Sequence, residues 1–124
     1  MSEIRVTTIS DTAGTGPVTL TKQHAAKVWV NFDGTTSGTT IRDSFNVSST
    51  TDTANGNYDV GISNAMSSAN YCYAGIANGS GSSNSQVNGD GALQASTIFL
   101  RALNTADNYQ DSDGIYIVAH GDLA

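Results

Sequence analysis

The sequence predicts an all-β fold, an antiparallel β-sandwich of about eight strands. Two observations support this fold class. Apolar and β-branched residues occur in short runs, and clusters of Gly, Asn, Asp, Ser and Thr that are typical of turns separate these runs. Helical periodicity is almost absent, because the best helical candidate, residues 21–30, contains the strand-favouring run Val28-Trp29-Val30.

The expected strands follow one another along the chain, and turn residues end most of them. A first strand is expected at residues 4–9, where apolar and polar residues alternate, and residues 11–17 end it. Asp33-Gly34 closes the second strand, and a hydroxyl-rich link leads from the third to the tight-turn dipeptide Asn55-Gly56. The second and later strands are expected at residues 25–32, 41–47, 58–62, 70–76, 92–103 and 114–120.

In three of these runs the alternation predicts one apolar face on the core and one polar face in solvent, because side chains two residues apart in a strand share a face. Asp43 breaks this pattern, since it falls on the apolar side of its strand. A buried carboxylate needs a partner, for which Arg42, Lys27, Arg101 or backbone N–H groups could serve. The residues expected on the core-facing sides are Val28, Val30, Phe32, Ile41, Asp43, Phe45, Val47, Tyr58, Val60 and Ile62.

The two long runs at residues 92–103 and 114–120 are apolar on both faces. A small domain needs a second layer to cover such strands, and the sequence offers no amphipathic helix for this purpose. A neighbouring subunit is the simplest cover, so we expect a homotrimer with Phe99, Tyr116, Val118 and Trp29 near the subunit contact. The alternative is that both strands lie in the middle of the sandwich and that loops cover their outer side chains.

The composition narrows the classes of partner. The formal net charge is −6 and only five residues are Lys or Arg, which argues against nucleic-acid binding, because phosphates require clustered cations. With 13% charged residues, solubility depends on Ser, Thr, Asn and Gly, as expected for a protein that contacts sugars or copies of itself. No apolar stretch is long enough to insert into a membrane, and the first residues lack the features of a secretory signal.

Residues 78–91 form the most biased segment, in which only Gln86 and Val87 are not Gly, Ser, Asn or Asp. We expect a loop here, because the segment is too long for a tight turn and has little to bury. Two interpretations stay open: a mobile connector, or an adaptable contact surface with many short hydrogen-bonding groups.

No residue pattern points to catalysis. The carboxylates fall mostly in turns, where Asp accepts local backbone hydrogen bonds, and no nucleophile has a base beside it in the sequence. His24 and His120 have no neighbouring metal ligands, so we expect no metal site and no cofactor. The run Asp111-Ser112-Asp113-Gly114 is similar to the start of a calcium loop, and whether it binds calcium stays open.

Two central motifs carry a resemblance to a known family. They are Lys27-Val28-Trp29-Val30-Asn31-Phe32 and Ile41-Arg42-Asp43-Ser44-Phe45-Asn46-Val47-Ser48-Ser49. Further matches are Gly56, Tyr58, Val60, Ala65, Met66, Ala69, Asn70, Tyr71, Gly121 and Asp122. The pattern resembles the C-terminal module of tail-fibre and other virion structural proteins of bacteriophages, especially marine ones. The resemblance implies a fibre-type β module at residues 25–124, preceded by a docking segment and first strand at residues 1–24.

The resemblance implies a protein of the phage virion, on the tail fibre or the capsid surface, that binds other virion proteins. Our first hypothesis is a tail-fibre tip that attaches to a host surface glycan or protein. The residues expected to contact this receptor are Trp29, Tyr71, Tyr73, Asn78, Ser82, Asn84, Asn88 and Tyr109. The second is a head-decoration, head-fibre or adaptor protein without receptor binding, which the absence of a long trimeric shaft favours. A glycan-degrading enzyme is the third and weakest hypothesis, because paired acids in a long groove are missing.

Overall fold

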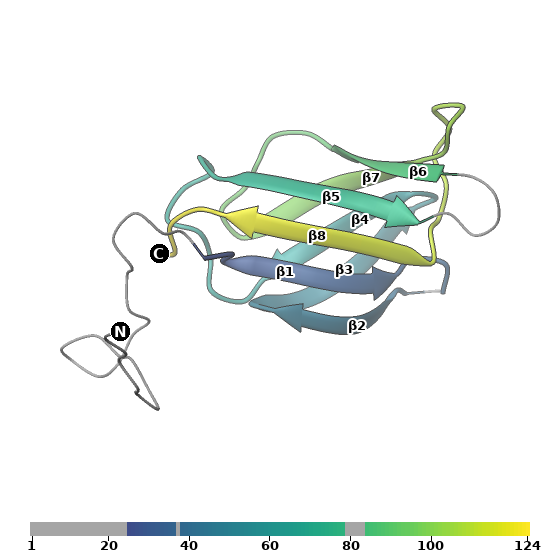
Figure 1. Cartoon of the computed structure of the whole chain (residues 1–124). Coiled ribbons are helices and arrows are strands. Elements are labelled where there is room, and N and C mark those ends of the chain that lie inside the picture. Colours follow the sequence, from purple (N-terminus) through teal and green to yellow (C-terminus); the bar gives the residue numbers. More distant parts are fainter. Residues whose placement is uncertain (1–24, 37, 79–83) are drawn as a thin grey trace, which may run out of the picture.

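The structure, a computed structural model, describes residues 25–36, 38–78 and 84–124 (Figure 1). Within these ranges the chain forms strands and turns and contains no helix. The strands are β1 (Val28–Asp33), β2 (Thr40–Phe45), β3 (Val47–Ala54), β4 (Asn57–Ile62), β5 (Cys72–Asn78), β6 (Asn84–Gly89), β7 (Thr97–Leu103) and β8 (Gly114–His120). The strand expected at residues 4–9 and the docking segment of residues 1–24 lie outside the described residues.

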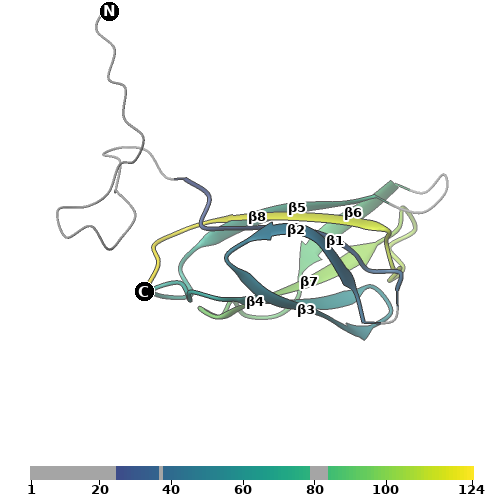
Figure 2. The ribbon, with the colours of Figure 1, turned by 90° about the horizontal axis from the view of Figure 1, so that it is seen from below.

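The eight strands form one antiparallel sheet in the order β2-β1-β8-β5-β6-β7-β4-β3, which confirms the predicted all-β antiparallel fold. The sheet curls into a nearly closed barrel (Figures 1 and 2). The front of the barrel consists of β2, β1, β8 and β5, and the rear consists of β7, β4 and β3. Two separate sheets of a sandwich were expected. Instead β6 pairs with both β5 and β7 and joins front and rear into a single sheet.

The core confirms most of the predicted alternation. In β4 and β7 every second residue is buried, and β1 and β8 follow nearly the same pattern. Front and rear share this interior, where the rings of Phe32 and Tyr58 meet edge to face with centroids 5.4 Å apart. The buried hydrophobic residues are Val28, Val30, Phe32, Tyr58, Val60, Ile62, Met66, Tyr71, Ala77, Ile98, Leu100, Ala102, Ile115, Ile117 and Ala119.

The prediction for β2 was wrong, because a β-bulge interrupts its alternation. Phe45 and Asp43 pair with the outward-facing Trp29 and Asn31, but the register then shifts and Ile41 pairs with the buried Phe32. Phe45 is therefore 52% exposed rather than part of the core. Ile41 lies at the open edge of the sheet and is 38% exposed.

Asp43 also differs from the expectation of a buried, paired carboxylate. It is exposed, and its Oδ1 accepts a hydrogen bond from the backbone N–H of Ser44 at 2.8 Å. Val47 is the one residue of this predicted face that packs against the core, from the start of β3.

Two strands were missed in the sequence. The hydroxyl-rich link after residue 47 is β3, an edge strand that pairs with β4 through the two-residue turn Asn55-Gly56. The turn itself was predicted, and Gly56 adopts the positive φ of 70° that such turns require. The second missed strand is β6, whose six residues lie within the expected loop at residues 78–91.

Candidate functional site

The front of the barrel carries a continuous apolar surface on its outside. Phe45, Trp29, Val118 and Ala74 lie side by side in one row, because each is the register partner of the next across β2, β1, β8 and β5. In the neighbouring row Tyr116 pairs with Ile76. We call these six residues the front stripe.

Several side chains of the front stripe are unusually exposed for their size. Ile76 is 66% exposed and Phe45 is 52% exposed, while Trp29 and Tyr116 are each more than one third exposed. Single exposed apolar residues are common on proteins, but a contiguous group in register across four strands marks an interaction surface.

One end of the front stripe is hollowed. A shallow, open hollow of about 300 Å³ lies on β5 and β8, and its lining is almost entirely apolar. The residues around it are Ala74, Gly75, Ile76, Tyr116, Ile117 and Val118. Ala74 is the smallest outward-facing side chain in the row, and it lines the hollow together with Val118 of its own row and with Ile76 and Tyr116 of the neighbouring row.

The structure brings together three of the four residues predicted at a subunit contact. Trp29, Tyr116 and Val118 are all members of the front stripe. Phe99 is separate, since it lies on β7 opposite Asp59 at the rear of the barrel. The sequence reasoning missed Phe45, Ala74 and Ile76. Ala74 and Ile76 do alternate with Tyr73 and Gly75, but their place beside β8 follows only from the pairing register.

Two of the tyrosines expected at a receptor contact are used inside the protein. That expectation assumed exposed rings, and the assumption was wrong for Tyr71, which is buried with its hydroxyl 2.9 Å from the carbonyl oxygen of Gln94. The half-buried Tyr73 donates a hydrogen bond to the carbonyl oxygen of Phe99 at 3.2 Å. Burial raises the pKa of both hydroxyls above the ordinary value of 10.0.

Two other residues predicted to contact a receptor, Asn88 and Tyr109, are exposed at the rear of the barrel. Asn88 on β6 is exposed and pairs with Arg101 on β7, and the Arg101 guanidinium lies 5.4 Å from the ring centroid of the exposed Tyr109. Arg101 also forms an ion pair with Asp90. Together these residues form a small polar and aromatic cluster at the rear of the barrel, next to β6.

The predicted residues that remain lie near the end of β5. Asn78 is exposed at the end of this strand and pairs with Asn84 at the start of β6. Ser82 lies outside the described residues.

The segment similar to a calcium loop is tied to the barrel by Asp111. Its Oδ1 accepts a hydrogen bond from the backbone N–H of Gly56 at 2.7 Å and lies 3.0 Å from the Tyr58 hydroxyl. Burial and the hydrogen bond to this carboxylate raise the pKa of Tyr58 well above its ordinary value. Burial and the nearby Asp111 charge also raise the pKa of Asp52. Asp111 thus fastens the turn between β3 and β4 to the segment before β8.

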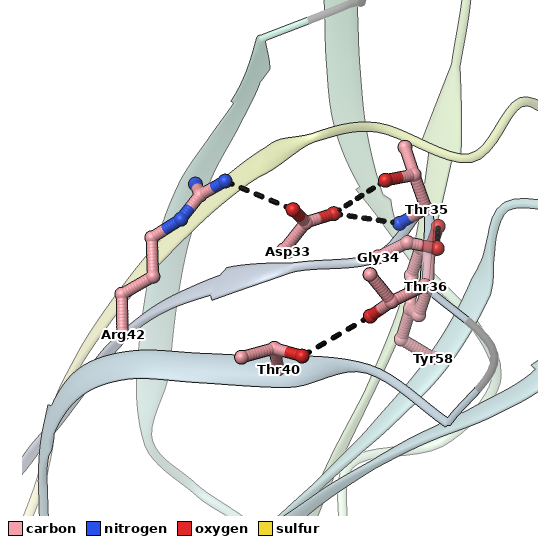
Figure 3. A network of polar contacts seen from close by, with 7 residues as sticks. All are labelled: Asp33, Gly34, Thr35, Thr36, Thr40, Arg42 and Tyr58. Carbon is pink, nitrogen blue, oxygen red and sulfur yellow. Dashed lines mark hydrogen bonds and ion pairs between the residues drawn. The ribbon is translucent and has the colours of Figure 1, made fainter.

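A second polar network lies at the same end of the barrel (Figure 3). The Asp33 carboxylate accepts hydrogen bonds from the hydroxyl and the backbone N–H of Thr35, at 2.6 and 2.9 Å, and forms an ion pair with Arg42 at 3.0 Å. The hydrogen bonds from Thr35 and the Arg42 charge lower the pKa of Asp33. The ion pair joins Arg42 at the bulge in β2 to Asp33 at the end of β1.

Within the described ranges no three His, Cys, Asp or Glu side chains are grouped so that they could hold a metal ion. In the same part of the chain no helix is long and apolar enough to cross a membrane. No protein-family model matches the sequence, and neither a curated protein nor a solved structure matches it.

Proposed function

We propose that this chain is a non-catalytic protein of a bacteriophage virion surface, a tail-fibre tip that assembles as a homotrimer and attaches to the host. The front stripe is the observation that supports assembly, and the resemblance of the two central motifs to phage tail-fibre modules supports the rest of the proposal. A small all-β barrel with a contiguous apolar surface across four strands has a face that needs a partner, and copies of the same chain provide one.

Assembly through the front leaves the rear of the barrel free for a receptor. There the ring of Tyr109, the Arg101 guanidinium and the Asn88 amide offer an aromatic plane beside hydrogen-bonding groups. Such groups can bind a sugar ring, whose face is apolar and whose edge is polar. Each site on its own is small, so attachment depends on three copies acting together.

The test is binding of the purified protein to a panel of bacterial strains, measured with a fluorescent label and by competition with infecting phage. We expect saturable binding to strains that the phage infects. The Tyr109→Ala variant should bind more weakly at unchanged assembly, and Thr51→Ala, an exposed change on β3, is the matched control. Turnover of host polysaccharide by the purified protein would contradict the non-catalytic part of the proposal.

One observation favours a second function, that of a head-decoration, head-fibre or adaptor protein. The front stripe is uncharged and apolar, which suits permanent contact with another virion protein as well as contact with a second copy. Attachment to phage particles that lack this protein, without any binding to host cells, would establish this function and contradict receptor binding.

A further inference from the structure

The chain contains three Asn-Gly pairs, the dipeptide in which asparagine most readily loses its side-chain nitrogen as ammonia. Two of them, Asn55-Gly56 and Asn88-Gly89, lie within the described residues, and the third includes Gly79, which does not. We propose that Asn88-Gly89 is a site of spontaneous deamidation, and that Asp111 protects Asn55-Gly56 from the same reaction.

The reaction needs only the chain and water. The backbone nitrogen that follows the asparagine loses its proton and attacks the side-chain Cγ. The new N–Cγ bond forms, the Cγ–Nδ2 bond breaks, and the released nitrogen takes up a proton and leaves as ammonia. Water then opens the five-membered succinimide ring at either of its carbonyl carbons, which gives an aspartyl or an isoaspartyl residue. Glycine in second place favours the attack, because it has no side chain to obstruct the nitrogen and its backbone rotates freely.

Both reacting groups of Asn55-Gly56 are held by hydrogen bonds. The Asn55 amide donates to the carbonyl oxygen of Tyr109 at 2.8 Å, and its Oδ1 accepts a hydrogen bond from the backbone N–H of Asp111 at 3.3 Å. The attacking group, the backbone N–H of Gly56, donates to the Asp111 carboxylate at 2.7 Å. This carboxylate opposes loss of the proton, because the loss would create a second negative charge beside its own.

The surroundings also hold the backbone of Gly56 in one conformation. Gly56 is buried with a φ of 70°, and its carbonyl oxygen accepts a hydrogen bond from the N–H of Ala102 at 2.7 Å. An added Cβ at Gly56 would lie only 2.6 Å from backbone atoms of Ala102 and Gln110. Closure of the succinimide ring requires the turn to rotate out of this conformation, so hydrogen bonds must break before Asn55 can react.

Asn88-Gly89 lies at the end of β6, where the strand has a neighbour on one side only. Both residues are exposed. The pairing of β6 with β5 ends at Gln86, so residues 87–89 pair with β7 alone. The side-chain hydrogen bond that Gln86 donates to Asp107 does not involve Asn88. Strand ends of this kind open more readily than the interior of a sheet, and opening brings the backbone nitrogen of Gly89 within reach of the Asn88 side chain.

The packing of Tyr73 explains why glycine follows Asn88. An added Cβ at Gly89 would lie 2.6 Å from the Tyr73 hydroxyl oxygen, and this hydroxyl is held by its hydrogen bond to the carbonyl oxygen of Phe99. The fold therefore favours, next to an exposed asparagine, the residue that most favours deamidation.

Deamidation of Asn88 would change the rear of the barrel in two ways. A carboxylate would replace the amide beside Arg101, the register partner of Asn88. The isoaspartyl product would also lengthen the main chain of β6 by a methylene group. Asn88 belongs to the receptor surface in the proposed function, so attachment should weaken as the protein ages. This consequence alone rests on the proposed function.

The test is incubation of the full chain in warm, mildly alkaline buffer, followed by peptide mass spectrometry and enzymatic detection of isoaspartyl residues. Asn88 should deamidate, and Asn55 should react about tenfold to a hundredfold more slowly, the effect of first breaking a hydrogen bond to a charged group. In denaturant, where these hydrogen bonds are absent, both should react at similar rates. Asn88→Gln is the control at β6, because its longer side chain closes the corresponding ring far more slowly.

Variants at the turn test the role of Asp111. Asp111→Ala frees the N–H of Gly56 and should accelerate deamidation of Asn55 by about tenfold or more. Tyr58→Phe is the matched control, because it also removes a hydrogen bond to Asp111 but leaves the one from Gly56. Asn55 should stay protected in this control. Circular dichroism checks that both variants are folded. If Asp111→Ala does not fold, Asp111→Asn takes its place, and its neutral side chain should give a smaller acceleration.

Three results would contradict the proposal or its consequence. Equal rates at Asn55 and Asn88 in the folded chain would overturn it, and so would an Asn88 that stays intact while the denatured chain reacts. An unchanged rate at Asn55 in a folded Asp111 variant would overturn the role of Asp111. Deamidated protein that binds host cells as well as fresh protein would contradict the receptor surface of the proposed function, while the deamidation itself would be established.

Discussion

Two strands of the barrel have the same sequence character and very different surroundings. Both β8 at the front and β7 at the rear carry apolar residues on both of their faces. The outer side of β8 lies between Trp29 and Ile76, so its apolar residues extend into a continuous stripe. The outer side of β7 lies between polar neighbours, where Asp59 is the register partner of Phe99. An apolar surface is thus a property of adjacent strands, and the pattern of a single strand does not determine it.

The variants with the largest expected effect on the free energy of unfolding test whether front and rear share one interior. Leu100→Ala at the rear and Ile117→Ala at the front both remove buried side chains, and each should lower the free energy of unfolding by about 2–5 kcal/mol. Urea denaturation followed by tryptophan fluorescence measures this, since Trp29 is the only tryptophan. Different transition midpoints for Trp29 fluorescence, which reports on the front, and for far-UV circular dichroism, which reports on all strands, within one variant would contradict a shared core.

The next effect concerns the link between the β3–β4 turn and the segment before β8. Tyr58→Phe keeps the ring in the core but removes the hydroxyl that lies beside Asp111 and the carbonyl oxygen of Gly34. We expect a loss of about 1.5–3 kcal/mol in the free energy of unfolding, the usual contribution of a hydrogen bond to a charged group. A loss below a few tenths of a kcal/mol would show that water replaces the hydroxyl at this position.

The raised pKa of Tyr58 predicts how the stability of the fold changes at alkaline pH. Because the pKa of Tyr58 is raised in the folded state, its contribution to stability is complete below the pKa of an unfolded tyrosine, about 10. The contribution decreases as the pH rises through that value. Stability should therefore fall above pH 10, and the Tyr58→Phe variant should lose less over the same range. Tyr71 and Tyr73 shift in the same direction, so part of the decrease will remain in the variant.

Two variants that each add one charge are expected to change stability little. They distinguish the front surface from the rear surface by their effect on assembly. Ile76→Asp on the front stripe and Asn88→Asp at the rear introduce the same charge at exposed positions. Both should change the free energy of unfolding by less than about 0.5 kcal/mol. Only the front change should shift the assembly towards monomers, which light scattering coupled to size exclusion measures. Equal masses for the two variants would mean that the front stripe does not mediate assembly.

The last effect is a modest one and concerns the ion-pair network beside the bulge in β2. The lowered pKa of Asp33 means that its carboxylate contributes to stability above the pKa of an unfolded Asp, about 3.9, and that this contribution is lost as the pH falls below it. Asp33→Asn should cost at most about 1 kcal/mol at neutral pH, because solvent screens the pair with Arg42. The difference between variant and original chain should shrink in acid and in high salt, as thermal denaturation at several pH values would show.

Much of the interior could be predicted from the sequence. The alternation in residues 28–32 and 58–62 identified buried faces that the structure confirms, because each of these strands pairs with a neighbour on both sides and its own residues alternate without interruption. The turn at Asn55-Gly56 was predicted for a related reason, since its backbone conformation favours glycine. In these segments the conformation that the local residue pattern favours is the one found in the folded chain.

The failures have identifiable physical causes. The bulge in β2 adds one residue to the strand, and no local signal distinguishes Arg42 as the extra residue. β3 and β6 lack the apolar residues by which strands are recognised. β3 is an edge strand with a mostly exposed surface, and β6 has Val87 as its only β-branched residue. The front stripe was only partly predicted, because Phe45 and Ile76 join it through pairings between distant parts of the chain.

The position of β8 determines when this chain can fold. The strand nearest the C-terminus lies between β1 and β5 and pairs with both along most of its length. Until residues 114–120 have left the ribosome, β1 and β5 each present an open edge with unpaired N–H and C=O groups. Such edges are the surfaces through which incomplete β proteins aggregate. Closure of the front thus joins distant segments late, and slow folding is expected.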